Sequence, residues 1–143
     1  IINSGEIKPQ QLKLEVTETF MLDNFVQGKK VLNNLKNIGA TIAIDDFGTG
    51  YSSLSYLLEL PLDTLKIDRA FINNIEEDKR SFQIVETIMS LSNTLDIDVV
   101  AEGIETEKQM SILTNLGCDF CQGFHISKPL TSTQTLDFIK NYN

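Results

Sequence analysis

Hydrophobic and polar residues follow a strand-like pattern in five segments of the chain. β-branched and large apolar residues either alternate with polar ones or run uninterrupted for a few positions, as buried strands do. The segment that reads Thr-Ile-Ala-Ile-Asp from Thr41 to Asp45 is an example. Strands are predicted over residues 12–16, 41–45, 64–68, 97–102 and 120–124.

Between these strands, apolar residues recur at helical spacing. In the segment 106–116, Thr106 and Gln109 form a capping box at the start and Gly117 ends the helix. Strands that alternate with helices imply βαβ units and a parallel sheet, either open and doubly wound or part of a barrel. Helices are predicted over residues 23–38, 52–60, 80–95, 106–116 and 132–142.

The composition is that of one ordinary globular domain. A chain of 143 residues with 41% hydrophobic and 22% charged residues belongs to neither the disordered nor the low-complexity classes. Its formal net charge of −8 excludes a basic module that binds duplex nucleic acid. A small phosphate-bearing ligand remains compatible with this charge if metal ions intervene.

Targeting signals are not evident in the sequence. No apolar run approaches the roughly 18 residues of a membrane span, and the first residues form neither a basic leader nor an apolar signal core. We therefore expect a cytoplasmic domain. Because the chain starts without Met, we also expect it to be a piece of a longer protein, and that expectation is compatible with a membrane-anchored parent.

Polar side chains mark the carboxyl end of every predicted strand. Since parallel strands place these ends on one rim, residues far apart in the sequence are expected to meet there. A solvated loop start explains any one of these acids, but a shared site explains all of them better. The residues concerned are Glu15, Asp45, Asp46, Lys66, Asp68, Glu102 and Gln122.

The adjacent carboxylates of Asp45 and Asp46 indicate a cation site. Neighbouring carboxylates raise each other's pKa unless a cation compensates, and hard oxygen ligands without a His or Cys cluster favour Mg²⁺ or Mn²⁺. An exposed Asp-Asp turn is the simpler alternative. Lys66 either binds phosphate or water or forms a structural ion pair, and Glu102 ends a nearly continuous apolar strand, which favours a site role.

A dinucleotide-binding interpretation competes for the same segment. The run from Gly48 through Gly50 to Ser53 nearly spells G-x-G-x-x-G after a strand, and Asp68 follows where a ribose-binding acid would lie. Ser53 replaces the third Gly, and Asp45 with Asp46 would place two negative charges beside a pyrophosphate. A Rossmann-type domain is therefore the second-ranked hypothesis.

Five ordered motifs resemble those of EAL-domain cyclic di-GMP phosphodiesterases, from about residue 12 to residue 129. The resemblance implies a TIM-like (β/α) barrel of which about five βα units are present, so that residues 1–143 form a single incomplete EAL domain. It also implies metal-dependent hydrolysis of cyclic di-GMP to linear pGpG in bacterial second-messenger signalling. The motifs are Leu14-Glu-Val-Thr-Glu18, Asp45-Asp-Phe-Gly-Thr-Gly-Tyr-Ser-Ser53, Leu65-Lys-Ile-Asp68, Ala101-Glu-Gly-Ile-Glu105, and Gln122-Gly-Phe124 with Lys128-Pro129.

The resemblance also implies roles for individual residues, around a site with two Mg²⁺ or Mn²⁺ ions. Lys66 and Glu102 would be catalytic, with Lys66 orienting or activating the attacking water. Metal ligation would fall to Glu15, Asp45, Asp46 and Glu102, supported by Asp68, and substrate contact to Gln122, Gly123 and Pro129. Coupling of the site to subunit pairing would fall to Glu18, Phe47, Gly48, Thr49, Gly50, Tyr51, Ser52 and Ser53.

The chain departs from the family pattern in one respect. The signature Glu-Ala-Leu and the Asn motif of the next strand are absent from these residues. Two hypotheses follow: part of a working phosphodiesterase that dimerises and carries sensory or signalling domains, or a non-catalytic module for nucleotide or protein binding. An open barrel fragment would expose strand edges, so we expect this chain to associate.

Overall fold

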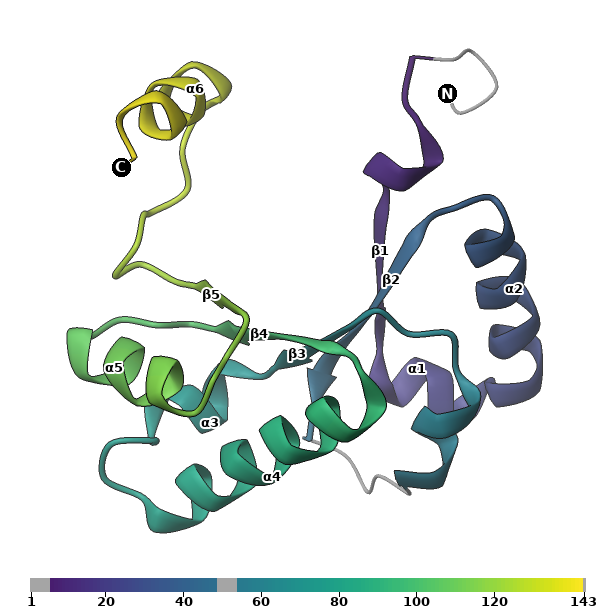
Figure 1. Ribbon diagram of the computed structural model, residues 1–143, viewed down its shortest axis with the longest axis horizontal. Coiled ribbons are helices and arrows are strands. Elements are labelled where there is room, and N and C mark those ends of the chain that lie inside the picture. The colour runs from purple at the N-terminus through teal and green to yellow at the C-terminus, as the bar shows by residue number, and fades with distance from the viewer. Residues whose placement is uncertain (1–5, 49–53, 143) are drawn as a thin grey trace.

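Five parallel strands form one sheet in the computed structural model, which describes residues 6–48 and 54–142 (Figure 1). The strands lie side by side in the order in which they occur along the chain. All five predicted strands are confirmed, with ends that differ by no more than two residues. They are β1 (Lys13–Thr17), β2 (Thr41–Phe47), β3 (Thr64–Ile67), β4 (Asp98–Glu102) and β5 (Phe120–Gln122).

The strand order decides between the two sheet architectures. A doubly wound sheet reverses direction at a switch point, so its strands do not follow the chain order. A barrel adds each strand beside the previous one, as this sheet does. The Rossmann-type alternative is therefore wrong, and the partial TIM-like barrel is confirmed.

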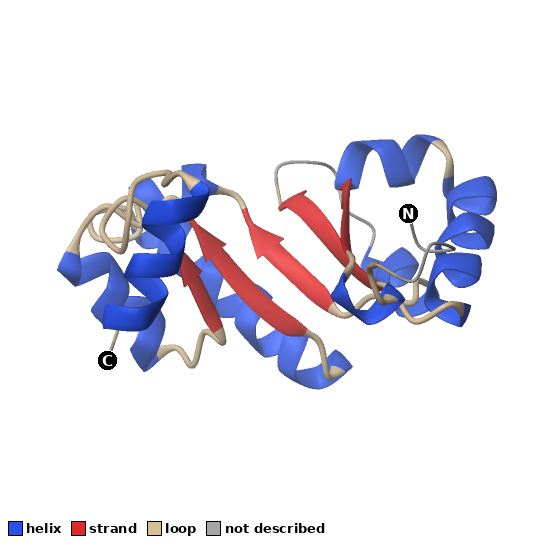
Figure 2. Ribbon diagram, turned by 90° about the horizontal axis from the view of Figure 1, so that it is seen from above, coloured by secondary structure: helices blue, strands red, loops and turns tan. Residues whose placement is uncertain are grey.

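In Figure 2 the strands lie side by side, with helices behind them and at both ends of the sheet. A short helix that the sequence did not predict starts directly after β3, because the Asp68 carboxylate accepts the N–H of Ala70 at 2.7 Å and caps it. The predicted segment 52–60 is a 3-10 helix in its described part. The helices are α1 (Glu18–Asp23), α2 (Phe25–Asn37), α3 (Arg69–Asn73), α4 (Lys79–Leu95), α5 (Glu107–Asn115) and α6 (Ser132–Asn141), with 3-10 turns η2 (Pro9–Gln11) and η3 (Leu54–Glu59).

A helix that the sequence did not predict also precedes the first predicted one. α1 begins at Glu18, because the side chain of Thr17 accepts the N–H of Phe20 at 3.4 Å and caps it directly at the end of β1. At Asn24 the backbone leaves helical geometry, with φ −127°, and α2 starts afresh. The helix predicted over residues 23–38 is α2, and α1 is additional.

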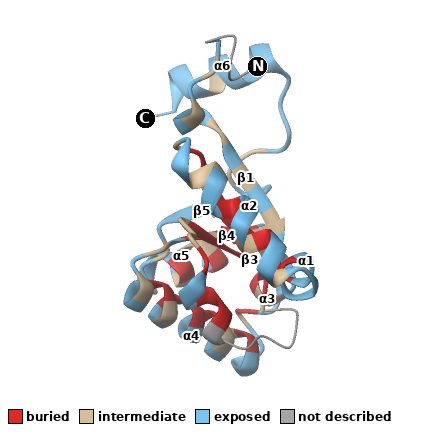
Figure 3. Cartoon of the chain, turned by 90° about the vertical axis from the view of Figure 1, so that its right-hand side faces the viewer, coloured by how far each residue is buried: buried red, intermediate tan, exposed pale blue. Residues whose placement is uncertain are grey.

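The two faces of the sheet have different characters. Leu65 and Val99 are fully buried in the hydrophobic core. Figure 3 shows buried segments on the strands and on α4. Because successive strand residues point to opposite faces, Lys66 and Val100 point to the other face. That face carries exposed residues such as Phe120, which is 54% exposed. In the described residues it is open, as the inside of an incomplete barrel would be.

The C-terminal helix stands apart from the core. α6 has no buried residue and follows an extended connection from β5 (Figure 1). Within the described chain, β1 and β5 each pair with one neighbour only. The prediction that such edges promote association stays a prediction. No helix among the described residues has the length and apolar character that crossing a bilayer requires.

Candidate active site

Four neighbouring strands each contribute one charged side chain to a cluster near their carboxyl ends. The ammonium Nζ of Lys66 on β3 lies 2.6 Å from Glu15 Oε2 on β1, 3.1 Å from Asp45 Oδ1 on β2 and 2.9 Å from Glu102 Oε1 on β4. The Lys66 side chain is only 8% exposed. We call these four residues the rim cluster. The structure thus brings together residues that lie up to 87 positions apart, from residue 15 to residue 102.

Strand register explains why these four side chains meet. Glu15 lies opposite Ala43 on β2, and Asp45 is two residues further along β2, so its side chain is on the same face. Lys66 lies opposite Val100 on β4, and Glu102 is likewise two residues further along β4, on the same face. All four side chains therefore point to the face that no helix covers.

The rim cluster keeps Lys66 charged. Burial by itself would lower the pKa of Lys66, but hydrogen bonds to Glu15, Glu102 and Asp45 outweigh it and raise the pKa above the ordinary value for lysine. An ammonium held in this way donates hydrogen bonds. It does not accept a proton at neutral pH.

Asp46 and Asp68 form a second pair of acids beside the rim cluster. Asp46 has a left-handed backbone with φ 55°, at an irregularity in the pairing of β2 with β3 between Ile44 and Phe47. Burial, the charge of Asp45 and a hydrogen bond to Asp68 raise the pKa of the Asp46 carboxyl. Carboxylates crowd together here, as a cation site requires.

Glu18 holds the turn that follows these acids. Its side chain is 1% exposed, and its Oε2 accepts the N–H of Gly48 at 3.0 Å. Gly48 has φ 94°, a conformation that glycine adopts at little cost. Phe47 is buried beside it. Of the predicted coupling segment, Thr49, Gly50, Tyr51, Ser52 and Ser53 lie outside the described residues.

A cavity of about 190 Å³ adjoins the rim cluster at Glu102. Gln122 and Gly123, predicted as substrate contacts, both line it, whereas Pro129 is exposed and does not. The predicted site residues do not include four of its lining residues, although each follows a strand end by one to three positions. They are Arg69, Gly103, Glu105 and Phe124.

Two glycines allow the walls of this cavity to approach closely. A Cβ on Gly103 would meet the Cβ of Arg69 at 2.5 Å, and a Cβ on Gly123 would meet the carbonyl oxygen of Ile104 at 2.1 Å. Backbone atoms of Ile104 cannot swing aside as a flexible side chain would. The cavity wall is thus built by direct contact between the chain after β4 and the chain after β5.

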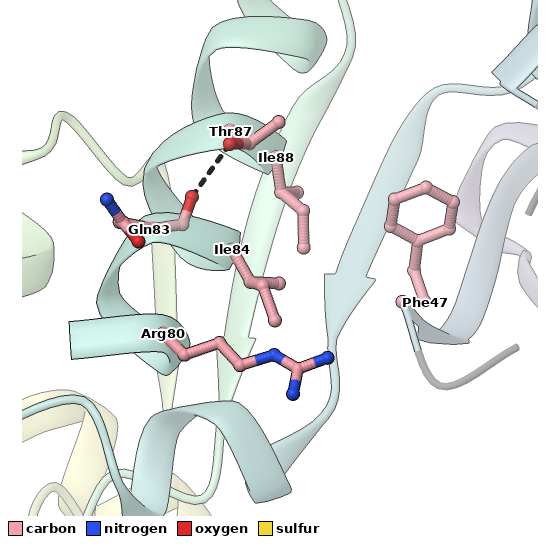
Figure 4. A pocket seen from close by; sticks show the side chains of 7 residues that line it. Phe47, Arg80, Gln83, Ile84, Thr87 and Ile88 are labelled. Atoms are coloured by element: carbon pink, nitrogen blue, oxygen red, sulfur yellow. Dashed lines mark hydrogen bonds between the residues drawn. The ribbon is translucent and has the colours of Figure 1, made fainter. Parts of the chain in front are cut away.

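A larger cavity of about 330 Å³ lies between the end of β2 and α4. Figure 4 shows Ile84 and Ile88 of α4 facing Phe47 across it, with Arg80 at the same edge. No residue of the rim cluster lines it. No sequence pattern indicates this cavity, because its two walls are far apart along the chain.

The described residues do not form a complete metal site on their own. Across residues 6–48 and 54–142, no three Asp, Glu, His or Cys side chains lie close enough together to hold a metal ion. The three carboxylates of the rim cluster instead converge on the ammonium of Lys66. The space between these three carboxylates suits a cation, and the ammonium of Lys66 occupies it.

Comparison with known protein families identifies the family of this chain. Residues 1–129 match the model of the EAL domain. The chain belongs to the EAL domain family. MucR of Pseudomonas aeruginosa, a bifunctional diguanylate cyclase and cyclic di-GMP phosphodiesterase, is 46% identical over 130 residues, which are 91% of this chain and 19% of MucR. The chain spans about a fifth of the length of such curated relatives.

Solved EAL structures share the fold. A complex of the MucR phosphodiesterase with cyclic di-GMP superimposes with a TM-score of 0.90 at 44% identity, over 94% of this chain and 54% of that one. The isolated EAL domain of Mycobacterium smegmatis DcpA gives 0.88 at 36% identity, over 97% and 62%. Klebsiella pneumoniae BlrP1 with manganese and cyclic di-GMP gives 0.83 at 38% identity, over 90% and 33%. The family prediction is confirmed.

Proposed function

We propose that this chain forms one side of the active site of an EAL domain that hydrolyses cyclic di-GMP to linear pGpG. The observation that carries the proposal is the rim cluster, in which one buried lysine joins carboxylates from three other strands. Its relative MucR is named as a bifunctional diguanylate cyclase and cyclic di-GMP phosphodiesterase. The rest of the domain would come from outside these 143 residues, since they cover 62% of the DcpA EAL domain.

The donor atoms fit divalent metal ions of the Mg²⁺ or Mn²⁺ type. Every candidate ligand is a carboxylate, the class that hard cations prefer, and three of them already converge on a positive charge. BlrP1 has been solved with manganese. Bound metal would lower the pKa of a water and stabilise charge on the phosphate. The proposed ligands are Glu15, Asp45, Asp46 and Glu102, with Asp68 behind Asp46 and further ligands from EAL strands outside this chain.

Lys66 acts as a donor in this proposal. Because three carboxylates hold its ammonium charged, it can orient an attacking water or a phosphate oxygen but cannot remove a proton. Its buried position fixes the direction of its N–H groups, which limits the geometries of attack. Proton acceptance falls to a carboxylate of the cluster, for which we propose Glu102.

Substrate contact is proposed for the cavity beside Glu102. Gln122 and Gly123 line it together with Arg69, whose guanidinium can offset the negative charge of a nucleotide. Pro129 lies further along the same connection and is a proposed contact outside the cavity. Glu18 and the segment 47–53 would link this site to pairing with a second copy. Attached signalling domains are proposed because relatives such as MucR are much longer than this chain.

Hydrolysis of cyclic di-GMP by the complete EAL domain that carries this chain tests the proposal. In Mn²⁺ buffer, with product followed by chromatography, wild type is expected to release linear pGpG and Asp45→Asn to lose at least about 100-fold of the rate. Asp137→Asn is the matched control, because Asp137 lies on exposed α6. Full activity of Asp45→Asn would remove Asp45 from the site.

One observation favours a second candidate, a non-catalytic EAL module. The described residues lack a complete metal site. Such a module would bind cyclic di-GMP without hydrolysing it, so binding by calorimetry together with no product would support this candidate over the first.

A further inference from the structure

Gln109 joins two segments of the chain that border the cavity beside Glu102. It lies in the first turn of α5 and is only 5% exposed. Its side-chain Oε1 accepts the N–H of Glu105 at 2.7 Å and the N–H of Thr106 at 3.1 Å. Its Nε2 donates to the carbonyl oxygen of Ile72 in α3 at 3.2 Å, although the two residues are 37 positions apart. One buried amide thus connects the segment after β4 to α3.

Both of these segments line the cavity. Arg69, the first residue of α3, lies about one helical turn before Ile72, and Glu105 lies just beyond the end of β4. Between them, Arg69 packs so closely against Gly103 that a Cβ on this glycine would lie 2.5 Å from the Cβ of Arg69. The amide of Gln109 holds the chain on both sides of this contact. It therefore fixes how far the guanidinium of Arg69 lies from the carboxylate of Glu105.

Burial makes the bridge through Gln109 a firm one. A buried amide or carbonyl without a partner is costly, so a shift of either segment would break hydrogen bonds that water cannot readily replace. A second connection runs the same way, because the hydroxyl of Thr106 donates to Glu76 and Lys108 Nζ lies 3.2 Å from the same carboxylate. The side chain of Lys108 is 65% exposed, so this second contact is the weaker one.

A second glutamine of the chain shows that helix capping alone does not require such a bridge. Gln134 occupies the corresponding position of α6, in the same Thr-x-x-Gln capping box, and its Oε1 accepts the N–H of Thr131 at 2.9 Å. Gln134 is exposed, and these hydrogen bonds stay at the start of its own helix. The contact of Gln109 with Ile72 is therefore an addition to the capping box.

We propose that Gln109 is a positioning residue for the substrate cavity, which holds Arg69 and Glu105 at the separation that the substrate requires. Gln109 itself lies outside the lining of the cavity. Because a guanidinium binds acceptors and a carboxylate binds donors, a change in their separation disturbs both kinds of contact at once. The inference rests on the proposed function in that cyclic di-GMP contacts this cavity. The rim cluster depends on strand register, so loss of the bridge should impair binding more than the chemical step.

Replacing Gln109 with methionine removes the bridge and keeps a side chain of similar length. In the complete EAL domain, well below the Tm of each variant, Gln109→Met is expected to raise the KM for cyclic di-GMP about tenfold and to change kcat less than about threefold. Gln134→Met is the matched control, because it removes the same capping contact from α6 and should leave KM unchanged. A lower Tm with an unchanged KM in Gln109→Met would overturn the proposal.

Gln109→Glu separates the bridge from the capping box. Its carboxylate keeps an acceptor for the N–H groups of Glu105 and Thr106 but has no N–H for the carbonyl of Ile72. We expect KM to stay raised in this variant. A wild-type KM would show that the capping box alone suffices, which contradicts the proposal.

A measurement without substrate distinguishes this inference from the proposed function. The N–H of Ile104 donates to Gln122 at 3.1 Å and the N–H of His125 donates to Ile104 at 2.9 Å, so both amides report how firmly the cavity walls meet. Hydrogen exchange at these amides should be about tenfold faster in Gln109→Met and unchanged in Gln134→Met. Unchanged exchange in a folded Gln109→Met domain would overturn the inference. Faster exchange in a domain that hydrolyses no cyclic di-GMP would support the positioning role and contradict only the proposed function.

Discussion

Replacing Lys66 with methionine isolates the charge at the centre of the rim cluster. Methionine keeps most of the apolar stem, which is buried, and removes the ammonium that contacts Glu15, Asp45 and Glu102. Three carboxylates then face one another without a counter-charge. We expect the complete EAL domain to lose stability and, because the donor to water or phosphate is gone, to lose at least about 100-fold of its turnover.

The size of the stability loss follows from burial. Removing one partner of a fully buried ion pair costs about 3–5 kcal/mol. Here the lysine is 8% exposed, but its partners Glu15, Asp45 and Glu102 are 45%, 25% and 22% exposed, so water screens part of the repulsion left behind. We therefore expect a loss of about 2–3 kcal/mol in the free energy of unfolding, without metal and at low ionic strength.

Urea unfolding at several pH values measures this loss in the free energy of unfolding and the direction in which the loss changes with pH. Because the folded-state pKa of Lys66 is raised above the ordinary 10.5, its stabilisation is complete below that value and is lost as pH rises through the folded-state pKa. The gap between wild type and variant should stay constant between about pH 7 and pH 9 and shrink above 10.5.

Lys29→Met provides the comparison. Lys29 contacts Glu59 at 2.8 Å, but these side chains are 36% and 56% exposed, so its loss should cost less than about 1 kcal/mol. Equal effects of the two substitutions would refute the reasoning from burial. A stable Lys66→Met domain with normal turnover would also remove Lys66 from the site.

Two further substitutions test how the fold positions the site. Gly123→Ala would place a Cβ 2.1 Å from the carbonyl oxygen of Ile104, so we expect a loss of about 3 kcal/mol or more by urea unfolding. Gly117→Ala meets no atom within 4 Å and should cost only the about 1–2 kcal/mol of a left-handed backbone, and equal losses would contradict the steric explanation. Thr106→Ala removes the acceptor for the Gln109 N–H at the start of α5 and should cost about 1 kcal/mol, seen as a lower Tm. Thr114→Ala, later in α5, should lower the Tm less, and the opposite order would contradict the capping role.

The sequence predicts that the residues of the rim cluster meet, because this prediction needs only the local pattern of each strand. Each acid or lysine ends an apolar strand, and parallel strands bring their carboxyl ends together. Alternation along β1 and β3 then places Glu15 and Lys66 on one face, and the structure bears this out. What alternation cannot give is the register between strands, and register decides that Lys66 contacts three carboxylates at once.

The parts that the sequence missed depend on contacts between distant segments. The helix α3 is too short for a periodic pattern and exists because Asp68 caps it. The role of Arg69 in the cavity wall likewise depends on its packing against Gly103, which no local pattern encodes.

Hydrolysis of cyclic di-GMP in Mn²⁺ buffer, with this chain and the complete EAL domain assayed side by side, tests the central claim most directly. The account predicts linear pGpG from the complete domain and none from the chain alone, because no three Asp, Glu, His or Cys side chains among the described residues lie close enough together to hold a metal ion. No product from either polypeptide, with both folded, would contradict the claim and support a non-catalytic EAL module.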